Sequence, residues 1–374
     1  MAGAIATITM PKWGLTMTEG MVAKWLVMPG SAVCAGDEVM EIETTKITNV
    51  FESPAGGTLR RQVAPEGDTV PVGGLLAVLA GDDVTETEID AFIAKFQAEF
   101  VPPADEEGEA SAGPALIEAG GRRLRYLRLG PQDGLPILFL HGFGADLNTW
   151  MFNQPALAER HATYALDLPG HGGSSKEVGS GDAAALMTAV MDFMTAAAIA
   201  RAHLVGHSLG GALALGLARA DPGRVASLTL IAPAGLGPDI NMAFIDGFIG
   251  AGKRRETKEA LELLVADRGA ISRAMIDEVL KYKRLDGVAA ALQAIAAAAF
   301  SGGRQQIDLR GALAAVNVPR LVIWGRADRI IPAGHADGLP AGVAVHLLDG
   351  AGHLPHMEKS GEVNRLLADL VSAV

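Results

Sequence analysis

The chain has 374 residues, of which 49% are hydrophobic and 20% are charged, and this composition excludes a disordered or fibrous protein. The length favours two domains over one. A single cysteine, Cys34, excludes an internal disulfide framework and suits a reducing compartment, so we expect a cytoplasmic protein. No apolar run reaches the roughly 18 residues that a membrane span needs, so we expect no membrane association.

The net charge of −12 lies mostly in one segment. Residues 1–80 carry −3, residues 81–115 carry −9, and residues 116–374 contain equal numbers of acidic and basic residues. Because the acidity is concentrated in a candidate linker and no basic surface is indicated, we expect no nucleic-acid partner. We likewise expect no metal site.

The first 80 residues contain an internal repeat. Residues 30–39 and 67–76 both read Gly-x-x-Val-x-x-Gly-x-x-apolar, and each segment continues into a short strand-like stretch. The glycines suit turns with positive φ, and the apolar positions suit strand residues that face inward. Two similar halves predict a small all-β domain with internal pseudo-symmetry.

Lys46 lies between the two halves, at the expected tip of a hairpin. A lysine at such a tip is usually only a solvated charge. This segment, however, resembles the lipoyl domains of 2-oxo-acid dehydrogenase complexes, which carry an acidic-x-x-Lys hairpin followed by Ser-Pro-Ala-Gly-Gly, here residues 53–57. The resemblance covers residues 1–80 and implies a flattened β-barrel in which lipoate is amide-linked to Lys46. Biotinyl domains are the alternative, but they place methionine on both sides of the lysine, where this chain has Thr45 and Ile47.

Residues 81–115 are predicted to form an acidic linker that contains one short helix. Thr85 and Glu88 form a capping-box pattern. Apolar residues then follow at helical spacing, namely Ile89, Phe92, Ile93, Phe96 and Phe100. We expect this helix to pack on a flanking domain, and the alternative is a helix that binds a partner. Beyond it, a stretch rich in proline, glycine and acidic residues predicts a mobile tether.

From residue 116 to residue 374, short apolar strands alternate with helices. The predicted strands are 137–140, 163–166, 203–205, 227–231, 320–324 and 343–347. This pattern predicts a parallel α/β sheet with helices on both faces. Residues from about 233 to 309 are mostly helical and are predicted to form a cap over the site.

A Gly-x-Ser-x-Gly motif centred on Ser208 follows a predicted strand and precedes a predicted helix, as a nucleophile elbow requires. Its glycines remove side chains that would clash at a strained turn, and the helix N-terminus favours developing negative charge. A His-Gly-Phe-Gly segment after an earlier strand predicts an oxyanion hole, formed by the backbone N–H groups of Phe143 and Leu209. His141 of that segment is interpreted as a hydrogen-bonded structural residue.

Asp328 and His353 complete a predicted catalytic triad. Asp328 follows a strand in a Gly-x-x-Asp context and is predicted to orient the catalytic histidine, with Asp239 as the alternative acid. His353 follows the last strand and is the predicted general base, whereas His356 is expected to pack beneath it. The order of nucleophile, acid and base along the chain is that of the α/β-hydrolase superfamily, which this larger domain resembles.

The whole architecture resembles the dihydrolipoyllysine-residue acetyltransferase components of bacterial acetoin dehydrogenase complexes. The resemblance implies that a thiamine-dependent component cleaves acetoin and leaves an acetyl group on dihydrolipoyl-lysine as a thioester. It further implies that this chain transfers the acetyl group to coenzyme A through an acetyl-serine. The implied partners are that thiamine-dependent component and lipoamide dehydrogenase, and we expect a homo-oligomer.

The sequence also departs from the acyltransferases of the better-known complexes. We identify neither a compact subunit-binding domain nor their C-terminal His-x-x-x-Asp-Gly motif. Two alternatives therefore stay open. In one, the protein is a hydrolase (a thioesterase or esterase) in which water deacylates the serine. In the other, it is chiefly a lipoyl carrier and scaffold with a vestigial triad.

Overall fold

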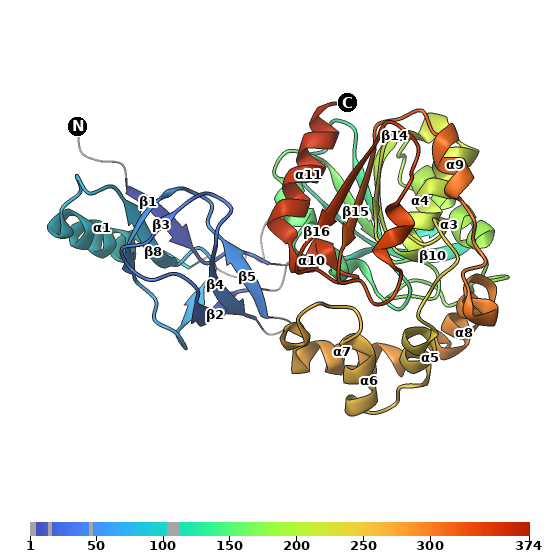
Figure 1. Ribbon diagram of the computed structural model, residues 1–374, viewed down its shortest axis with the longest axis horizontal. Coiled ribbons are helices and arrows are strands. Elements are labelled where there is room, and N and C mark those ends of the chain that lie inside the picture. Colours follow the sequence, from blue (N-terminus) through green and yellow to red (C-terminus); the bar gives the residue numbers. More distant parts are fainter. Residues whose placement is uncertain (1–4, 14–16, 45–47, 103–112) are drawn as a thin grey trace. The chain divides into compact units, whose positions relative to one another are not determined.

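The structure is a computed structural model that describes residues 5–13, 17–44, 48–102 and 113–374. The chain divides into two compact units (Figure 1). The smaller unit consists mainly of short strands, and the larger one is a sheet flanked by helices.

The smaller unit contains, within the described residues, eight strands in two antiparallel four-stranded sheets. One sheet has the order β1 (Ile5–Thr9), β8 (Leu75–Ala80), β6 (Gly57–Gln62), β3 (Ala32–Val33). The other has the order β5 (Thr48–Glu52), β4 (Glu38–Glu43), β2 (Glu19–Trp25), β7 (Thr69–Pro71). The second order follows from the first when each strand is replaced by the one four positions away along the chain, β1 by β5, β8 by β4, β6 by β2 and β3 by β7, so the two halves are arranged equivalently. Apolar side chains from both sheets share one core, which includes Ile8, Val22, Ile42 and Leu59.

The sequence repeat is visible in the backbone of the turns. The first glycines of the two halves, Gly30 and Gly67, have φ values of 91° and 89°. The second glycines, Gly36 and Gly73, have φ values of 92° and 81°. Glycine adopts this left-handed region without the clash that a Cβ atom causes. Equivalent turns thus share one conformation, which confirms the prediction of a pseudo-symmetric all-β domain.

β4 and β5 form the hairpin that brackets the predicted attachment lysine. Glu43 of β4 pairs with Thr48 of β5 at the end of this ladder. Lys46 itself belongs to residues 45–47, which lie outside the described residues. The assignment of lipoate to Lys46 therefore stays a prediction that rests on the sequence and on the flanking strands.

The linker helix, α1 (Glu86–Glu99), packs on the smaller unit. The Thr85 hydroxyl accepts from the backbone N–H of Glu88, and the Glu88 carboxylate accepts from the backbone N–H of Thr85, so the predicted capping box is present. Ile89 is fully buried against β8. The structure therefore supports packing on a flanking domain, the first of the two interpretations of this helix.

Replacing Ile89 by alanine is expected to lower the free energy of unfolding of the smaller unit by about 2–4 kcal/mol, because buried methyl groups are lost and a cavity remains. Native-state hydrogen exchange on the full chain should then show faster exchange in α1 and β8 and unchanged exchange in the larger unit. Lys95→Ala on the same helix, where 71% of the side chain is exposed, is the control and should change stability by less than about 0.5 kcal/mol. Wild-type protection of α1 in Ile89→Ala would contradict the prediction.

The larger unit is a mixed eight-stranded sheet. Its order is β16 (Val343–Leu348), β15 (Arg320–Gly325), β14 (Val225–Ile231), β13 (Ala202–His207), β11 (Ile137–Leu140), β12 (Thr163–Leu166), β10 (Arg122–Leu129), β9 (Ala115–Ala119). All six predicted strands are present and run parallel. The sequence analysis missed β9 and β10, an antiparallel hairpin beside β12, so the prediction of a wholly parallel sheet was wrong at this edge. The arginine-rich sequence of β10 lacks the apolar run that marks a buried strand.

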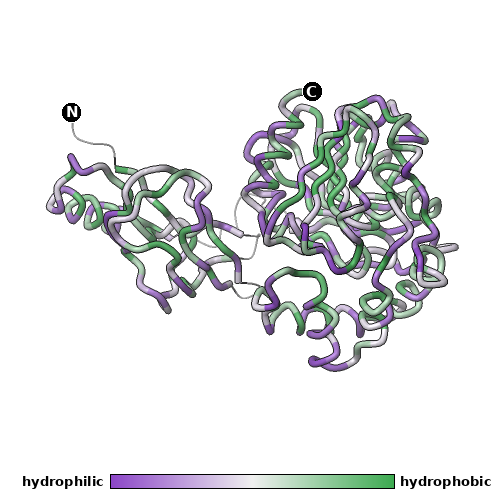
Figure 2. The backbone as a smooth tube through the Cα atoms, viewed as in Figure 1, coloured by the Kyte–Doolittle hydropathy of each residue, from purple (hydrophilic) through white to green (hydrophobic). Residues whose placement is uncertain are grey.

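Helices cover both faces of this sheet (Figure 1). On one face, α3 (Ala183–Ala196), α4 (Leu209–Ala220) and α9 (Arg310–Ala315) contact one another in series. On the other, α2 (Gln154–Ala158) contacts α11 (Ser360–Ser372). Figure 2 shows apolar residues concentrated in the central strands between these layers, as expected for parallel strands that are buried on both sides.

Between β14 and β15 the chain leaves the sheet and forms a cap of four helices, α5 (Met242–Gly250), α6 (Arg254–Leu261), α7 (Arg273–Lys283) and α8 (Val288–Ala299). They lie within the segment that the sequence assigned to a cap. Phe248 of α5 and Phe300, just after α8, pack against Phe143 in the loop that follows β11. The cap therefore covers the carboxyl end of the sheet.

Across the described residues, no single helix is long and apolar enough to cross a membrane. One bent pair of helices in the cap reaches the required length and apolar character, but only when the two helices are combined.

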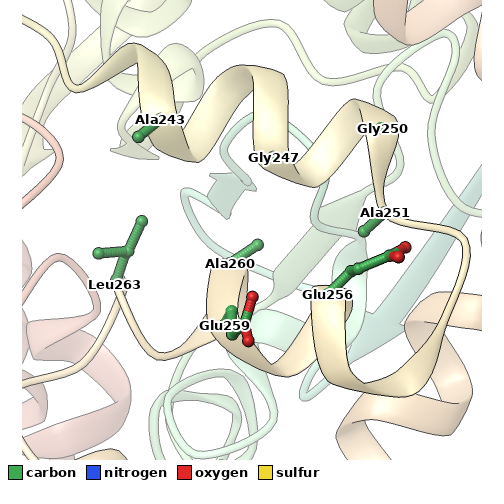
Figure 3. Close-up of a pocket in the computed structure, with 8 residues that line it drawn as sticks. All are labelled: Ala243, Gly247, Gly250, Ala251, Glu256, Glu259, Ala260 and Leu263. Carbon is green, nitrogen blue, oxygen red and sulfur yellow. The ribbon is translucent and has the colours of Figure 1, made fainter.

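A pocket of about 360 Å³ opens between α5 and α6 (Figure 3). Its lining consists mostly of small residues, Ala243, Gly247, Gly250, Ala251 and Ala260, together with Glu256, Glu259 and Leu263. None of the predicted site residues lines it. The pocket lies between two cap helices and is separate from the residues predicted to form the catalytic centre.

Candidate active site

Ser208 lies at the sharp turn that joins β13 to α4. Its φ of 52° and ψ of −115° form a conformation that residues other than glycine rarely adopt. Gly206 and Gly210 make the turn possible, because an added Cβ on either would lie 2.3 Å or 2.2 Å from a backbone oxygen. The structure thus places Ser208, which is 6% exposed, at the N-terminus of a helix, as a nucleophile elbow requires.

Two backbone N–H groups lie near this turn. Leu209 is the first residue of α4, so its N–H has no partner within the helix. The His-Gly-Phe-Gly segment packs against the elbow, because an added Cβ on Gly142 would lie 3.1 Å from the Cβ of Ser208. Phe143 follows Gly142 directly. The structure therefore brings the backbone beside Phe143 close to the elbow, and the oxyanion hole formed by the N–H groups of Phe143 and Leu209 stays a prediction.

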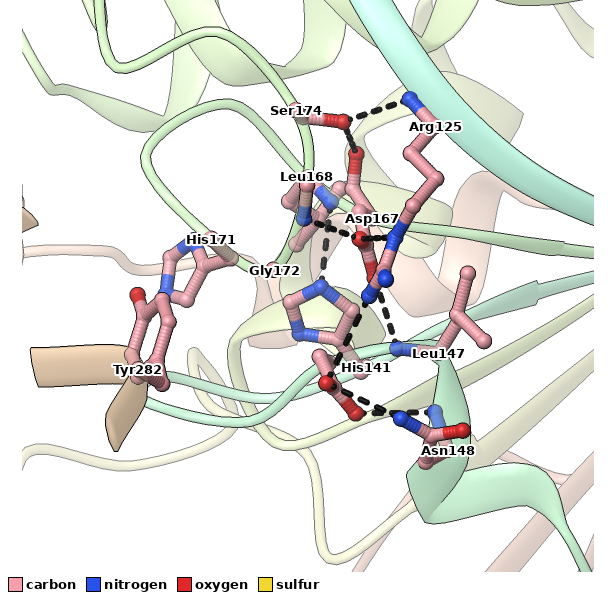
Figure 4. A network of polar contacts seen from close by, with 12 residues as sticks. Arg125, His141, Leu147, Asn148, Asp167, Leu168, His171, Gly172, Ser174 and Tyr282 are labelled. Carbon is pink, nitrogen blue, oxygen red and sulfur yellow. Dashed lines mark hydrogen bonds and ion pairs between the residues drawn. The ribbon is translucent and has the colours of Figure 1, made fainter. Parts of the chain in front are cut away.

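His141 is the first residue of the His-Gly-Phe-Gly segment, residues 141–144, which we call the oxyanion segment, and its ring holds this segment in place (Figure 4). Its Nδ1–H donates to the carbonyl oxygen of Gly142 at 2.8 Å, and its Nε2 accepts from the backbone N–H of Leu168 at 3.0 Å. Burial lowers the pKa of His141, so the ring is neutral and keeps one donor and one acceptor. The geometry agrees with a hydrogen-bonded structural histidine and not with a base.

Asp167, just after β12, is a fully buried carboxylate beneath the same segment (Figure 4). It accepts from Nε of Arg125 at 2.5 Å and from the backbone N–H groups of Leu147 and Gly173 at 2.8 Å and 2.7 Å. The Ser174 hydroxyl donates to the carbonyl oxygen of Asp167 at 2.6 Å. These bonds join the segment after β11 to the loop after β12, so Asp167 stabilises the backbone that is predicted to form the oxyanion hole.

Asp328 and His353 are brought together by the loops after β15 and β16. Oδ2 of Asp328 lies 2.7 Å from Nδ1 of His353, and both side chains are buried. Oδ1 of Asp328 accepts from the backbone N–H groups of Ile330 and Ile331 at 2.8 Å and 3.0 Å, which orients the carboxylate. Because Nδ1 of His353 donates to this acid, Nε2 is the nitrogen that is able to accept a proton.

Asp239, the alternative acid, lies elsewhere. Its Oδ2 is 3.1 Å from Nε2 of His335, and 72% of its side chain is exposed. A catalytic acid has to contact the base that it orients. The structure therefore brings Asp328, and not Asp239, to His353.

His356, the second histidine of the last loop, lies in α10 (Pro355–Glu358). It is fully buried, and its Nε2 lies 3.2 Å from the hydroxyl of Thr149. Burial lowers the pKa of His356 to about 3, with a further contribution from His353. His356 is thus a neutral packing residue beneath the base, as the sequence suggested.

The peptide group of His353 has two partners that the sequence analysis missed. Its N–H donates to the carbonyl oxygen of Leu264 in the cap at 2.7 Å. Its carbonyl oxygen accepts from Nε2 of His207 at 2.8 Å. His207 occupies the variable position of the Gly-x-Ser-x-Gly motif, and nothing in the local pattern indicates a partner 146 residues away.

Glu358 is a further residue that the sequence analysis missed. Its carboxylate accepts from the backbone N–H of Gly352, next to the base, at 2.7 Å and from that of Ala266 in the cap at 2.6 Å. Burial raises the pKa of Glu358. The carboxylate therefore links the loop that carries His353 to the cap.

Two family models match the chain. Residues 6–79 match the model of biotin and lipoyl attachment domains, described as Biotin-requiring enzyme, and residues 137–366 match the Alpha/beta hydrolase family. The dihydrolipoyllysine-residue acetyltransferase component of the acetoin cleaving system of Pseudomonas putida is 47% identical over 361 residues, which cover 96% of this chain and 97% of that protein. The component of the same name from Cupriavidus necator is 45% identical over 365 residues, which cover 97% and 96%. The chain belongs to this family of acetyltransferase components.

Membership in this acetyltransferase family confirms the expected architecture, a lipoyl domain joined to an α/β-hydrolase domain, with covalent lipoate as its cofactor. Solved structures show the fold of the larger unit alone. A meta-cleavage product hydrolase superposes with a TM-score of 0.64 at 21% identity, covering 70% of this chain and 98% of that one. A carboxylesterase from Bacillus subtilis has a TM-score of 0.63 at 18% identity, covering 71% and 93%. The roles of the individual site residues stay predictions.

Asp167→Asn is expected to destabilise the larger unit by about 3 kcal/mol, because Arg125 loses its partner and a buried amide cannot satisfy the same donors. Thermal unfolding of the full chain, followed in the larger unit by hydrogen exchange, measures the loss. Asp349→Asn is the matched control. Its ion pair with Arg326 is exposed, so the change should be below about 1 kcal/mol. Similar effects of the two variants would contradict the role given to Asp167.

Asp328→Asn is expected to slow covalent labelling of Ser208 by a fluorophosphonate about 10³–10⁴-fold, because asparagine does not hold His353 in the required tautomer. The rate of label incorporation, followed by mass spectrometry, is the measurement. Asp239→Asn should label at close to the wild-type rate, since that carboxylate contacts His335. A large loss in Asp239→Asn and none in Asp328→Asn would reverse the assignment.

Proposed function

We propose that this protein is the acyltransferase component of an acetoin-cleaving system and transfers an acetyl group from its own lipoyl-lysine to coenzyme A. The observation that carries the proposal is that one chain joins a lipoyl domain to a buried acid–histidine pair and a serine at a strained turn. A lipoyl group presents acyl groups as thioesters, and an activated serine attacks acyl carbonyls. The two units therefore have a substrate in common.

In this proposal Lys46 carries the lipoyl group. The flanking strands fit such a role, because Glu43 and Thr48 pair at the end of the β4–β5 ladder and residues 44–47 join them. When bound, lipoate supplies the acetyl group as a thioester, and the remaining chemistry is that of the chain's own residues.

The first half of the transfer acylates the serine. Oγ of Ser208 attacks the thioester carbonyl while its proton passes to Nε2 of His353, and Asp328 stabilises the imidazolium that results. The backbone N–H groups of Phe143 and Leu209 stabilise the oxyanion. The carbon–sulfur bond then breaks, the departing sulfur takes the proton from His353, and acetyl-Ser208 remains.

The second half of the transfer removes the acetyl group from Ser208 and regenerates the free hydroxyl. The thiol of coenzyme A gives its proton to Nε2 of His353 while its sulfur attacks the carbonyl of acetyl-Ser208. The ester bond to Oγ breaks, and Oγ recovers the proton. The products are acetyl-coenzyme A and the dihydrolipoyl dithiol, whose two thiols would need an oxidising partner to form the disulfide again. A thiamine-dependent acetoin-cleaving component and a lipoamide dehydrogenase are the partners that we propose.

Hydrolysis is the second candidate, because the fold is shared with hydrolases and the chemistry up to acetyl-Ser208 is identical. The burial of the site favours transfer. Ser208 is 6% exposed and His353 is 2% exposed beneath the cap. A covered site limits the access of water to the acyl-serine until an acceptor thiol occupies it.

The decisive experiment incubates acetyl-lipoylated protein with and without coenzyme A and measures acetyl-coenzyme A and acetate. We expect acetyl-coenzyme A to form rapidly and acetate only slowly, and Ser208→Ala to lower the transfer rate by about 10³-fold or more. Acetate released at the same rate with and without coenzyme A would identify a hydrolase. Acetyl-coenzyme A formation undiminished in Ser208→Ala would end the covalent mechanism.

Lys46→Arg separates attachment from catalysis. It keeps the positive charge, and its intact mass should lack the lipoyl group. With free S-acetyldihydrolipoamide as the donor, this variant should still form acetyl-coenzyme A, because the larger unit is unchanged. A lipoyl mass that persists in Lys46→Arg would place the attachment site elsewhere.

A further inference from the structure

The site contains a buried histidine that the proposed mechanism does not use. His207 directly precedes Ser208 and is buried at the end of β13. Its ring lies against the rings of His353 and His356, with centroid distances of 4.8 Å and 4.6 Å. A polar ring in such a position requires a reason beyond the filling of space, because burying it without hydrogen bonds is unfavourable.

The hydrogen bond of His207 defines its tautomer. Nε2 lies 2.8 Å from the carbonyl oxygen of His353. A carbonyl oxygen only accepts, so Nε2 carries the proton. Nδ1 is buried, has no hydrogen-bond partner in the described part of the chain, and faces Gly142, where an added Cβ would lie 2.8 Å from it. Burial and the two neighbouring histidines lower the pKa of His207 well below its usual value, so the ring is a neutral donor.

This bond completes the set of contacts that hold the base. The side chain of His353 donates to Asp328, its N–H donates to Leu264 of the cap, and its carbonyl oxygen accepts from His207. Each contact comes from a different element. Only the last one comes from β13, the strand that leads directly into Ser208, so it joins nucleophile and base without involving their reacting atoms.

We propose that His207 is a positioning residue, which fixes the main chain of His353 relative to Ser208 so that Nε2 of His353 stays within reach of Oγ. The proposal rests on the proposed triad. Its physical reason is geometric, since a misplacement of about 1 Å between reacting groups lowers a rate by roughly 10²-fold. Without His207, the carbonyl oxygen of His353 also loses its donor in a buried environment.

Two substitutions of similar size test this role. Glutamine at position 207 places an amide N–H near the location of Nε2–H, whereas leucine fills the space without a donor. In acetyl transfer from S-acetyldihydrolipoamide to coenzyme A, His207→Leu should lower kcat about 10–100-fold, and His207→Gln should restore it to within about threefold of wild type. KM for coenzyme A should be the same in all three proteins, because a positioning role affects the alignment of the reacting groups and not the binding of the acceptor.

Fluorophosphonate labelling of Ser208 provides a readout that needs no acyl acceptor. It should fall in His207→Leu and recover in His207→Gln. If the wild type labels but forms no acetyl-coenzyme A, the transfer proposal fails while the positioning role is still tested by labelling. If His207→Leu does not fold, His207→Asn replaces it, since its shorter side chain carries its donor too far from the carbonyl. Wild-type kcat in the variant without the donor, or equal losses with and without it, would overturn the proposal.

Discussion

The turn at Ser208 is the constraint on which the rest of the site depends. A residue with a side chain at φ of 52° is strained by about 1–3 kcal/mol, and such a conformation persists only where the surroundings enforce it. Here the enforcement is steric, because Gly206 and Gly210 admit backbone oxygens at distances that no Cβ tolerates. The same close packing brings Gly142 against the elbow. Ser208 and the oxyanion segment therefore pack together as one unit, and the strained residue is the predicted nucleophile itself.

The base depends on a different kind of constraint, a set of hydrogen bonds that crosses from the core to the cap. His353 donates to Leu264, and Glu358 accepts from Gly352 on the core side and from Ala266 on the cap side. In the proposed mechanism the cap therefore helps to position the base as well as covering the site. A rearrangement of the loop after α6 would act on the position of the base as well as on access to the site.

Much of this arrangement could be predicted from the sequence, because its signals are local. The Gly-x-Ser-x-Gly motif and the Gly-x-x-Asp pattern each follow a strand, and the repeat of the smaller unit needs only glycines at fixed spacing. The features that the sequence did not predict either lack a local sequence pattern or depend on residues that lie far apart in the chain. The arginine-rich sequence of β10 does not show the pattern of a buried strand, because this strand is only partly buried. The partner of His207 lies 146 residues away, and Glu358 bonds to backbone atoms that have no sequence signature.

The joining of the two units has a physical consequence for the choice between thiol and water. A donor tethered to its own catalytic domain acts at an effective concentration of roughly millimolar, so the site needs little affinity for the lipoyl group itself. Binding interactions at the site are then available for the acceptor, whose arrival has to precede deacylation. Because water is always in excess, the proposed transfer requires that water be kept from acetyl-Ser208, and the cap that covers the site serves this requirement. The same bonds that position His353 from the cap would thus also favour transfer over hydrolysis.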